Sequence, residues 1–180
     1  MKTMVLTVMA ATAAVVLAAA ATGNRQVTQN KLSPTAETSM TLGSHHVTIE
    51  YNAPSARGRK VEGGLIPYGQ PWRLGADAAT TLTTDADIMI GKLRVPKGVH
   101  TLYLLANENG PWELIVNKQT RQWGTEYNQG QDLGRVPMTE TKLSQPVEKL
   151  NIVLKPTGGS EGVLEIQWGT TQAGAPVKIG

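Results

Sequence analysis

The stretch IMIGKLRVPKGVHTLYLLA, residues 88–106, decides the fold class. Two short apolar segments, residues 88–90 and 93–95, flank Gly91-Lys92. A two-residue connection with glycine first is typical of a β-hairpin with a type II′ turn. A Pro-Lys-Gly turn then leads into residues 99–106, which are apolar enough to form a central strand buried on both sides. The stretch therefore predicts antiparallel β-structure.

Alternation of apolar and polar residues extends this prediction along the chain. In residues 46–51, Val47, Ile49 and Tyr51 lie on one face of a strand, and the polar residues lie on the other. The β-branched residues 80–84 indicate another strand. Further strands are expected over residues 112–117, 150–155 and 164–168.

Many short strands separated by glycine and proline predict an all-β fold, an antiparallel β-sandwich or jelly-roll-like barrel with little helix. Residues 107–110 indicate a second hairpin turn, and the polar residues 119–131 indicate a long loop. No segment after residue 21 has a convincing helical period, and residues 138–149 have room for one short helical turn.

The first residues indicate export. Lys2 precedes the uncharged run 4–21, which is rich in Ala, Val, Leu and Thr, so residues 1–21 are typical of a cleaved secretory signal peptide. The alternative is an uncleaved membrane anchor, but the run is short and only weakly apolar. We expect a periplasmic or extracellular protein that has no membrane attachment after cleavage. Residues 22–42 then form a linker or N-terminal arm, and residues 43–180 form a single domain.

Composition excludes several classes of protein. With no cysteine, the chain has neither disulfides nor a thiolate metal site. A formal net charge of +3 is too small to indicate nucleic-acid binding. Of the three histidines, His45 and His46 are adjacent and point to opposite faces of a strand, so we expect no metal and no cofactor. We find no nucleophile elbow and no phosphate-binding loop.

The stretch YNAPSARGRKVEGGLIPYGQPWRLGADAAT, residues 51–80, is the most site-like part of the sequence. Within it, the guanidinium of Arg73 and the carboxylate of Asp77 lie close in sequence to the aromatic ring of Trp72, a set that can hold a carboxylate or a sugar. In the alternative interpretation, Arg73 and Asp77 pair with each other or cap turn backbone, and Trp72 fills the core.

Other residues in this stretch are also open to two interpretations. Arg57 and Arg59 share a face if the chain is extended there, and with Lys60 they can approach an anionic ligand. In the alternative interpretation, these basic residues simply lie in a solvated loop. Tyr68 either binds a ligand through its hydroxyl or fixes the loop.

The tryptophans outside this stretch are predicted to play different roles. Trp112 and Trp168 are expected in the core, whereas Trp123 lies in the long loop and is expected near a site. The predicted ligand-binding residues are Arg57, Arg59, Tyr68, Trp72, Arg73, Asp77 and Trp123.

The same stretch closely resembles the DUF2911 family of exported bacterial proteins. Gly58-Arg59-Lys60, residues 63–69 and residues 72–80 carry the match, which continues in order over residues 32–179. The resemblance implies a compact β-sandwich with a signal peptide and no established activity. Family members tend to read Ser-Arg-Pro at residues 52–54 and Trp-Arg-Thr-Gly-Ala-Asn-Glu from residue 72 onwards, so an Arg and a Glu are missing here. The missing Glu weakens an enzymatic interpretation.

Three hypotheses of function follow. The leading one is a non-catalytic exported module that binds a small anionic or carbohydrate ligand or a protein partner through residues 51–80 and the Trp123 loop. The alternative is a hydrolase or lyase acting on cell-envelope or extracellular material, with Asp77 as acid or base and Arg73 stabilising negative charge. The third is a structural or interaction domain, which predicts no pocket and an exposed apolar patch or edge strand.

Overall fold

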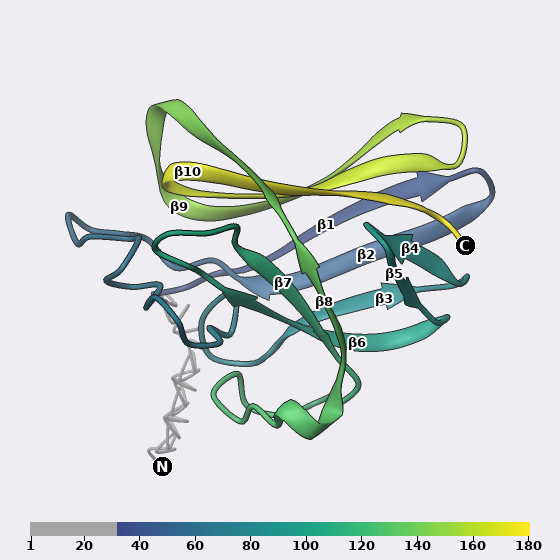
Figure 1. Ribbon diagram of the computed structural model, residues 1–180, viewed down its shortest axis with the longest axis horizontal. Helices are drawn as coiled ribbons and strands as arrows, with labels where there is room; N and C mark the ends of the chain where they lie inside the picture. Colours follow the sequence, from purple (N-terminus) through teal and green to yellow (C-terminus); the bar gives the residue numbers. More distant parts are fainter. Residues whose placement is uncertain (1–31) are drawn as a thin grey trace, which may run out of the picture.

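The computed structural model describes residues 32–180, which form two antiparallel β-sheets packed face to face (Figure 1). In this part of the chain there is no α-helix, and the one helical element is the short 3₁₀ turn η1 (Gln129–Gln131). The predicted all-β sandwich is confirmed. The predicted signal peptide and the first ten residues of the predicted linker or arm lie outside the described residues.

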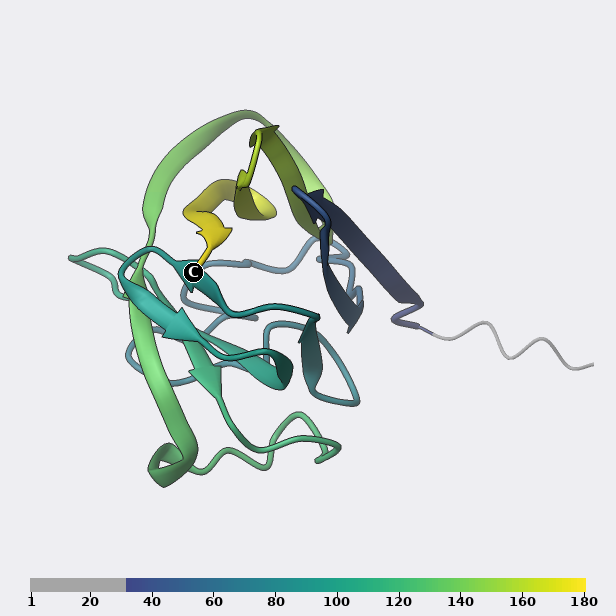
Figure 2. The same ribbon diagram turned by 90° about the vertical axis from the view of Figure 1, so that its right-hand side faces the viewer.

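Each sheet combines strands that are distant in sequence. The six-stranded sheet has the order β1-β2-β3-β6-β7-β8, and the four-stranded sheet has the order β5-β4-β10-β9. The strands of the first are β1 (Thr35–Leu42), β2 (His45–Asn52), β3 (Thr80–Thr84), β6 (Gly98–Leu105), β7 (Glu113–Asn117) and β8 (Asp132–Pro137). The strands of the second are β4 (Ile88–Ile90), β5 (Leu93–Val95), β9 (Thr139–Gly158) and β10 (Glu161–Ile179). Seen end-on, the two sheets curve around a common core (Figure 2).

The hairpin and the central strand predicted from the sequence are present. Ile90 pairs with Leu93 across a two-residue turn, and Gly91 has a φ of 57°, the positive value that the first central residue of a type II′ turn requires. Strand β6 lies between β3 and β7, and residues 100–105 are all buried. This sheet therefore has a buried centre.

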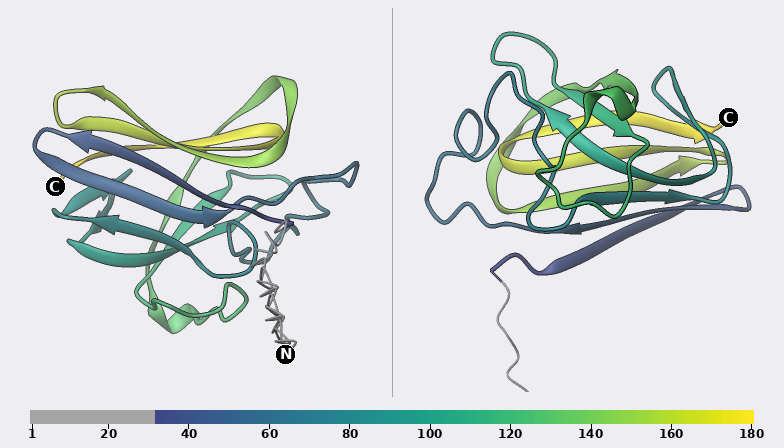
Figure 3. Two further views of the ribbon diagram at one scale, coloured as in Figure 1. Left: turned by 180° about the vertical axis from the view of Figure 1, so that it is seen from behind. Right: turned by 90° about the horizontal axis from the view of Figure 1, so that it is seen from below.

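The helical turn proposed within residues 138–149 is wrong. Residues 139–149 belong to β9, a continuous strand whose first part pairs with residues 171–174 of β10. Strand β10 bends where its register with β9 shifts on either side of Gly169, which has a φ of 61°. The β9–β10 ribbon consequently turns back over itself (Figure 3).

The two sheets are joined by side-chain hydroxyls as well as by the core. The Tyr51 hydroxyl on β2 accepts a hydrogen bond from the backbone N–H of Ile152 on β9, at 3.1 Å. Next to it, Thr38 Oγ1 on β1 accepts from the N–H of Leu154, also at 3.1 Å. These hydroxyls satisfy backbone donors along the edge of β9 where no further strand pairs.

The two long connections position the candidate site. Residues 53–79 link β2 to β3, and residues 118–131 link β7 to β8 (Figure 1). They meet at an isolated antiparallel bridge between Ala78 and Trp123. Trp112 and Trp168 are buried as predicted, with 4% and 2% of their surface exposed. No helix within the described range is long and apolar enough to cross a membrane.

Candidate functional site

Tight turns shape the connection 53–79. The N–H of Arg59 donates to the carbonyl oxygen of Ala56 at 3.0 Å, and both residues between them, Arg57 and Gly58, have positive φ, 51° and 72°. Positive φ at both central positions defines a type I′ turn. Arg57 and Arg59 therefore do not lie on one face of an extended segment, the geometry on which their pairing was predicted.

A cavity of about 490 Å³ nevertheless collects most of the predicted site. We call it the Trp72 cavity, because the indole of Trp72 forms part of its wall. Trp168, which the sequence indicated only as a core residue, lines it as well. Five of the seven predicted ligand-binding residues line it: Arg57, Arg59, Trp72, Arg73 and Asp77.

Two stacked tryptophans form a wall of this cavity. The ring centroids of Trp72 and Trp168 are 5.5 Å apart, and the ring planes differ by 21°. Backbone hydrogen bonds in both directions between Trp72 and Leu104, at 2.7 and 2.8 Å, fix Trp72 against β6. The indole N–H of Trp168 donates to the carbonyl oxygen of Glu148 at 3.0 Å. The pair is therefore a rigid aromatic surface whose Trp72 ring is only partly buried.

Backbone carbonyl groups hold the three guanidinium groups. Arg73 Nε donates to the oxygen of Gly75 at 3.1 Å, Arg59 donates to two carbonyl oxygens of its own turn at 2.9 Å each, and Arg57 donates to Leu32 at 3.2 Å. In the described part of the chain no carboxylate forms an ion pair with any of the three. Of the alternative roles predicted for Arg73, the structure shows the capping of turn backbone.

The connection 118–131 packs against Arg73 and Asp77, two of the residues that line the cavity. The backbone N–H of Gly124 donates to the carbonyl oxygen of Asp77 at 3.0 Å, and Asp77 has a φ of 58°. A Cβ atom on Gly124 would lie 2.8 Å from both Arg73 Cδ and the Asp77 oxygen. Trp123 is 51% exposed beside this contact and does not line the cavity.

Tyr68 lies apart from the guanidinium groups. Its ring lies against Gly63, where a Cβ atom would be 2.5 Å from Tyr68 Cε2. It lines a neighbouring cavity of about 400 Å³ together with Lys60, Glu62 and Lys142. Of the seven predicted residues, five therefore line the Trp72 cavity, Tyr68 lines the neighbouring cavity, and Trp123 is exposed outside both.

Sequence reasoning missed the polar cluster that anchors the connection 118–131. The rings of Tyr103 and Tyr127 meet edge to face with centroids 4.9 Å apart, and the Tyr127 hydroxyl donates to Asp132 Oδ2 at 2.6 Å. Burial, and to a lesser extent the hydrogen bond to Asp132, raise the pKa of Tyr127. Gln122 donates to the Tyr103 hydroxyl at 3.3 Å. The cluster holds the loop on the outer face of the sheet and makes Gly124 a fixed contact.

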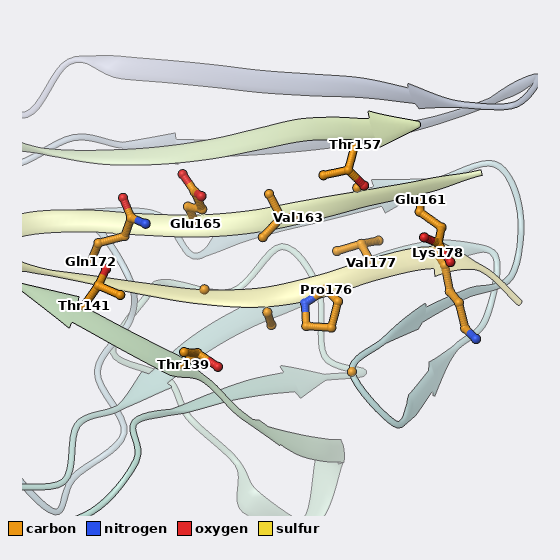
Figure 4. Close-up of a pocket in the computed structure, with 14 residues that line it drawn as sticks. Thr139, Thr141, Thr157, Glu161, Val163, Glu165, Gln172, Pro176, Val177 and Lys178 are labelled. Atoms are coloured by element: carbon orange, nitrogen blue, oxygen red, sulfur yellow. The ribbon is translucent and has the colours of Figure 1, made fainter. Parts of the chain in front are cut away.

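A separate cavity of about 590 Å³ lies over the β9–β10 ribbon (Figure 4). Glu161, Glu165 and Lys178 from β10 line it together with Thr139 and Thr141 from β9. None of the predicted ligand-binding residues lines this cavity. Its lining carries two carboxylates, one ammonium group and neutral side chains, so it does not share the basic character of the Trp72 cavity.

The histidines contact other protein groups. His45 Nδ1 lies 3.2 Å from Asp85 Oδ1, and the backbone N–H of His46 is the main cause of the lowered pKa of Asp85. His100 is buried, with Nε2 2.8 Å from the carbonyl oxygen of Pro96. No group of three His, Asp or Glu side chains that could hold a metal ion occurs within residues 32–180.

Comparison with curated proteins and with solved structures gave no match. A family model described as "Protein of unknown function (DUF2911)" matches residues 33–177, which include both long connections and all ten strands except the last two residues of β10. The resemblance inferred from residues 58–80 is thereby confirmed over most of the chain. The chain belongs to the DUF2911 family.

Proposed function

We propose that this protein is an exported, non-catalytic binding module whose Trp72 cavity takes a small anionic or carbohydrate ligand, with acidic sugars as the best fit. One observation carries the proposal: three guanidinium groups, held by backbone carbonyls, line a single cavity next to a stacked tryptophan pair. Its volume of about 490 Å³ lies in the range of ordinary ligand pockets.

The chemistry of the guanidinium group supports an anionic ligand. Each guanidinium has five N–H donors, and one or two contacts with carbonyl oxygens leave others for a ligand. A carbonyl contact orients the group without neutralising its charge. Because a planar guanidinium binds a carboxylate through two parallel hydrogen bonds, Arg73 and Arg59 suit a uronic acid better than a neutral sugar.

The tryptophan pair supports a carbohydrate. A sugar ring presents C–H groups on one face, and a partly buried indole offers an apolar surface on which that face can pack. The backbone of Trp72 is fixed by Leu104 and its ring stacks on Trp168, so little side-chain entropy is lost when a ligand binds. A ligand with both a carboxylate and a sugar ring uses every feature of the cavity.

Calorimetric titration of the purified protein with galacturonate, glucuronate and glucose tests this proposal. We expect the two uronates to bind and glucose to bind at least about 10-fold more weakly, because it lacks the charge-assisted hydrogen bonds. Arg73→Gln should remove this preference, whereas the matched control Lys97→Gln, which removes an exposed charge outside the cavity, should not. Equal binding of uronates and glucose, or binding of neither, would refute the proposal.

A hydrolase or lyase acting on cell-envelope or extracellular material is the second candidate, because Asp77 and Arg73 line the same open cavity. Glycoside hydrolysis ordinarily requires two carboxyl groups flanking the bond, and among the described residues that line the Trp72 cavity Asp77 is the one acidic residue. This favours binding without turnover. Release of reducing ends or unsaturated products from a uronate polymer, abolished by Asp77→Asn, would instead establish the enzyme.

A structural or protein-interaction role has weaker support. Within residues 32–180, the large hydrophobic residues that are exposed are Leu32, Val99 and Trp123. Leu32 lines the Trp72 cavity, Val99 lies on β6 and Trp123 lies in the connection 118–131. Single exposed apolar residues are normal on protein surfaces and do not by themselves indicate an interface.

A further inference from the structure

Asn109-Gly110 is the one Asn-Gly pair in the sequence, and it lies in the second predicted hairpin turn, residues 107–110. The structure has a turn there, which links β6 to β7. Both residues of the pair are exposed, and neither lines the cavities described above. The pair therefore has no part in the function proposed for the Trp72 cavity.

The two groups of this pair that can react with each other are free. Within residues 32–180, neither the side chain of Asn109 nor the backbone N–H of Gly110 makes a hydrogen bond. Apart from its chain neighbours, a Cβ atom on Gly110 would meet only Asn107 Cβ, at 3.8 Å, so the space beside the Gly110 main chain is open. Glycine also has more backbone freedom than other residues. The Gly110 nitrogen can therefore turn towards the Asn109 side chain.

The neighbouring asparagines of this hairpin are held in place. Asn107 Nδ2 donates to the carbonyl oxygen of Pro111 at 2.7 Å. Asn117 is buried, and its Nδ2 donates to Asp132 Oδ1 at 2.9 Å. Each of these two asparagines is also followed by a residue that has a side chain, which hinders the approach of the next backbone nitrogen. Asn107 and Asn117 are therefore internal references for Asn109.

We propose that Asn109 is a self-modification site, at which the backbone nitrogen of Gly110 attacks the side-chain amide without an enzyme. Asparagine is one of the chemically labile residues of proteins. A bond forms between the Gly110 nitrogen and Asn109 Cγ, the Cγ–Nδ2 bond breaks, and ammonia leaves with the proton of the Gly110 N–H. Water then opens the cyclic imide at either of its carbonyl groups, so the product is aspartate or isoaspartate. Because both reacting groups belong to one turn, the attack is intramolecular and favoured by proximity.

The modification changes the charge and the backbone of the turn but not the sheet. A neutral amide becomes a carboxylate, which is ionised at neutral pH, so the formal net charge of +3 falls by one. In isoaspartate the main chain runs through Cγ and is longer by one carbon. The pairing of β6 with β7 stops at Leu105 and Glu113, outside the turn, so both strands keep their register. Older molecules should therefore remain folded and become more acidic.

Incubation of the purified protein in mildly alkaline buffer tests the inference, because the Gly110 nitrogen attacks after it loses its proton. The tryptic peptide 98–118 contains Asn107, Asn109 and Asn117, so one mass spectrum compares all three. We expect NH₂ to be exchanged for OH at Asn109 alone, and we expect a protein isoaspartyl methyltransferase to methylate the incubated protein. Gly110→Ala should slow the exchange about 10-fold, because a side chain restricts the backbone and hinders the attack.

Each other outcome overturns the inference. Exchange in the isolated peptide 98–118 without exchange in the folded protein would show that the turn protects Asn109. Equally fast exchange at Asn107 or Asn117 would show that the open turn does not select the site. An unchanged rate in Gly110→Ala would exclude attack by the Gly110 nitrogen. None of these results bears on uronate binding, so the proposed function stands or falls separately.

Discussion

Replacing Gly124 by alanine tests whether the connection 118–131 holds the wall of the Trp72 cavity in place. The added methyl group would lie 2.8 Å from the carbonyl oxygen of Asp77 and 2.8 Å from Arg73 Cδ. The backbone oxygen cannot move away without breaking its 3.0 Å hydrogen bond to the Gly124 N–H. That bond is worth about 1 kcal/mol. Overpacking of a dense site costs about 1–3 kcal/mol, so we expect the free energy of unfolding to fall by about 2–4 kcal/mol.

Urea denaturation measures this loss as a shift in midpoint at an unchanged slope. Gly110→Ala is the matched control, since its methyl group would meet Asn107 Cβ at an ordinary 3.8 Å, and it should change stability by less than about 0.5 kcal/mol. Because Arg73 is displaced, Gly124→Ala should also weaken uronate binding. A Gly124→Ala protein with the stability and uronate affinity of wild type would show that the loop does not support the cavity.

Two further predictions concern the frame around the site. Tyr51→Phe removes the hydroxyl that accepts from the buried N–H of Ile152, and should lower the free energy of unfolding by about 1–3 kcal/mol; an unchanged urea midpoint would contradict the account of how the sheets are joined. The N–H of Lys97, and next the guanidinium of Arg94, lower the pKa of Asp87 from its usual 3.8. A carboxyl with a lowered pKa in the folded state stabilises the fold above its unfolded pKa, and this contribution is lost as pH falls through the folded value. The difference in unfolding midpoint between wild type and Asp87→Asn should therefore shrink below about pH 4, and a difference that stays constant to lower pH would refute this role.

Local patterns predicted the elements whose signals are local. The hairpin around Gly91 and the strand β3 have the bounds that the sequence indicated, because turn chemistry and alternation are properties of neighbouring residues. The first half of β9 has no such signal: most of residues 139–149 are exposed, so apolar residues do not alternate there. This segment is a strand because it pairs with residues 171–174 of β10, a partner that its own composition does not reveal.

In the candidate site, too, the sequence predicted what depends on neighbouring residues and missed what depends on distant ones. Arg57, Arg73 and Asp77 reach one cavity because they belong to one connection between two strands. Trp168 arrives from the far end of the chain, and its strand pattern indicated only burial. Tyr68 was grouped with these residues by proximity in sequence, but its packing against Gly63 places it in the next cavity. Proximity along the chain predicted the site in outline and did not predict how it is divided.

The pairing of distant segments has a consequence for the order in which the molecule folds. Strand β1 is tied to β9 through Thr38 and Leu154, and β4 gains its pairing with β10 from Val177–Ile179. The four-stranded sheet, which packs on the six-stranded sheet, is therefore complete only when residues 177–179 have been synthesised. Contacts between segments so far apart form slowly. A topology that delays folding until residues 177–179 have been synthesised would suit export of the chain before it folds, which is compatible with the export that we propose.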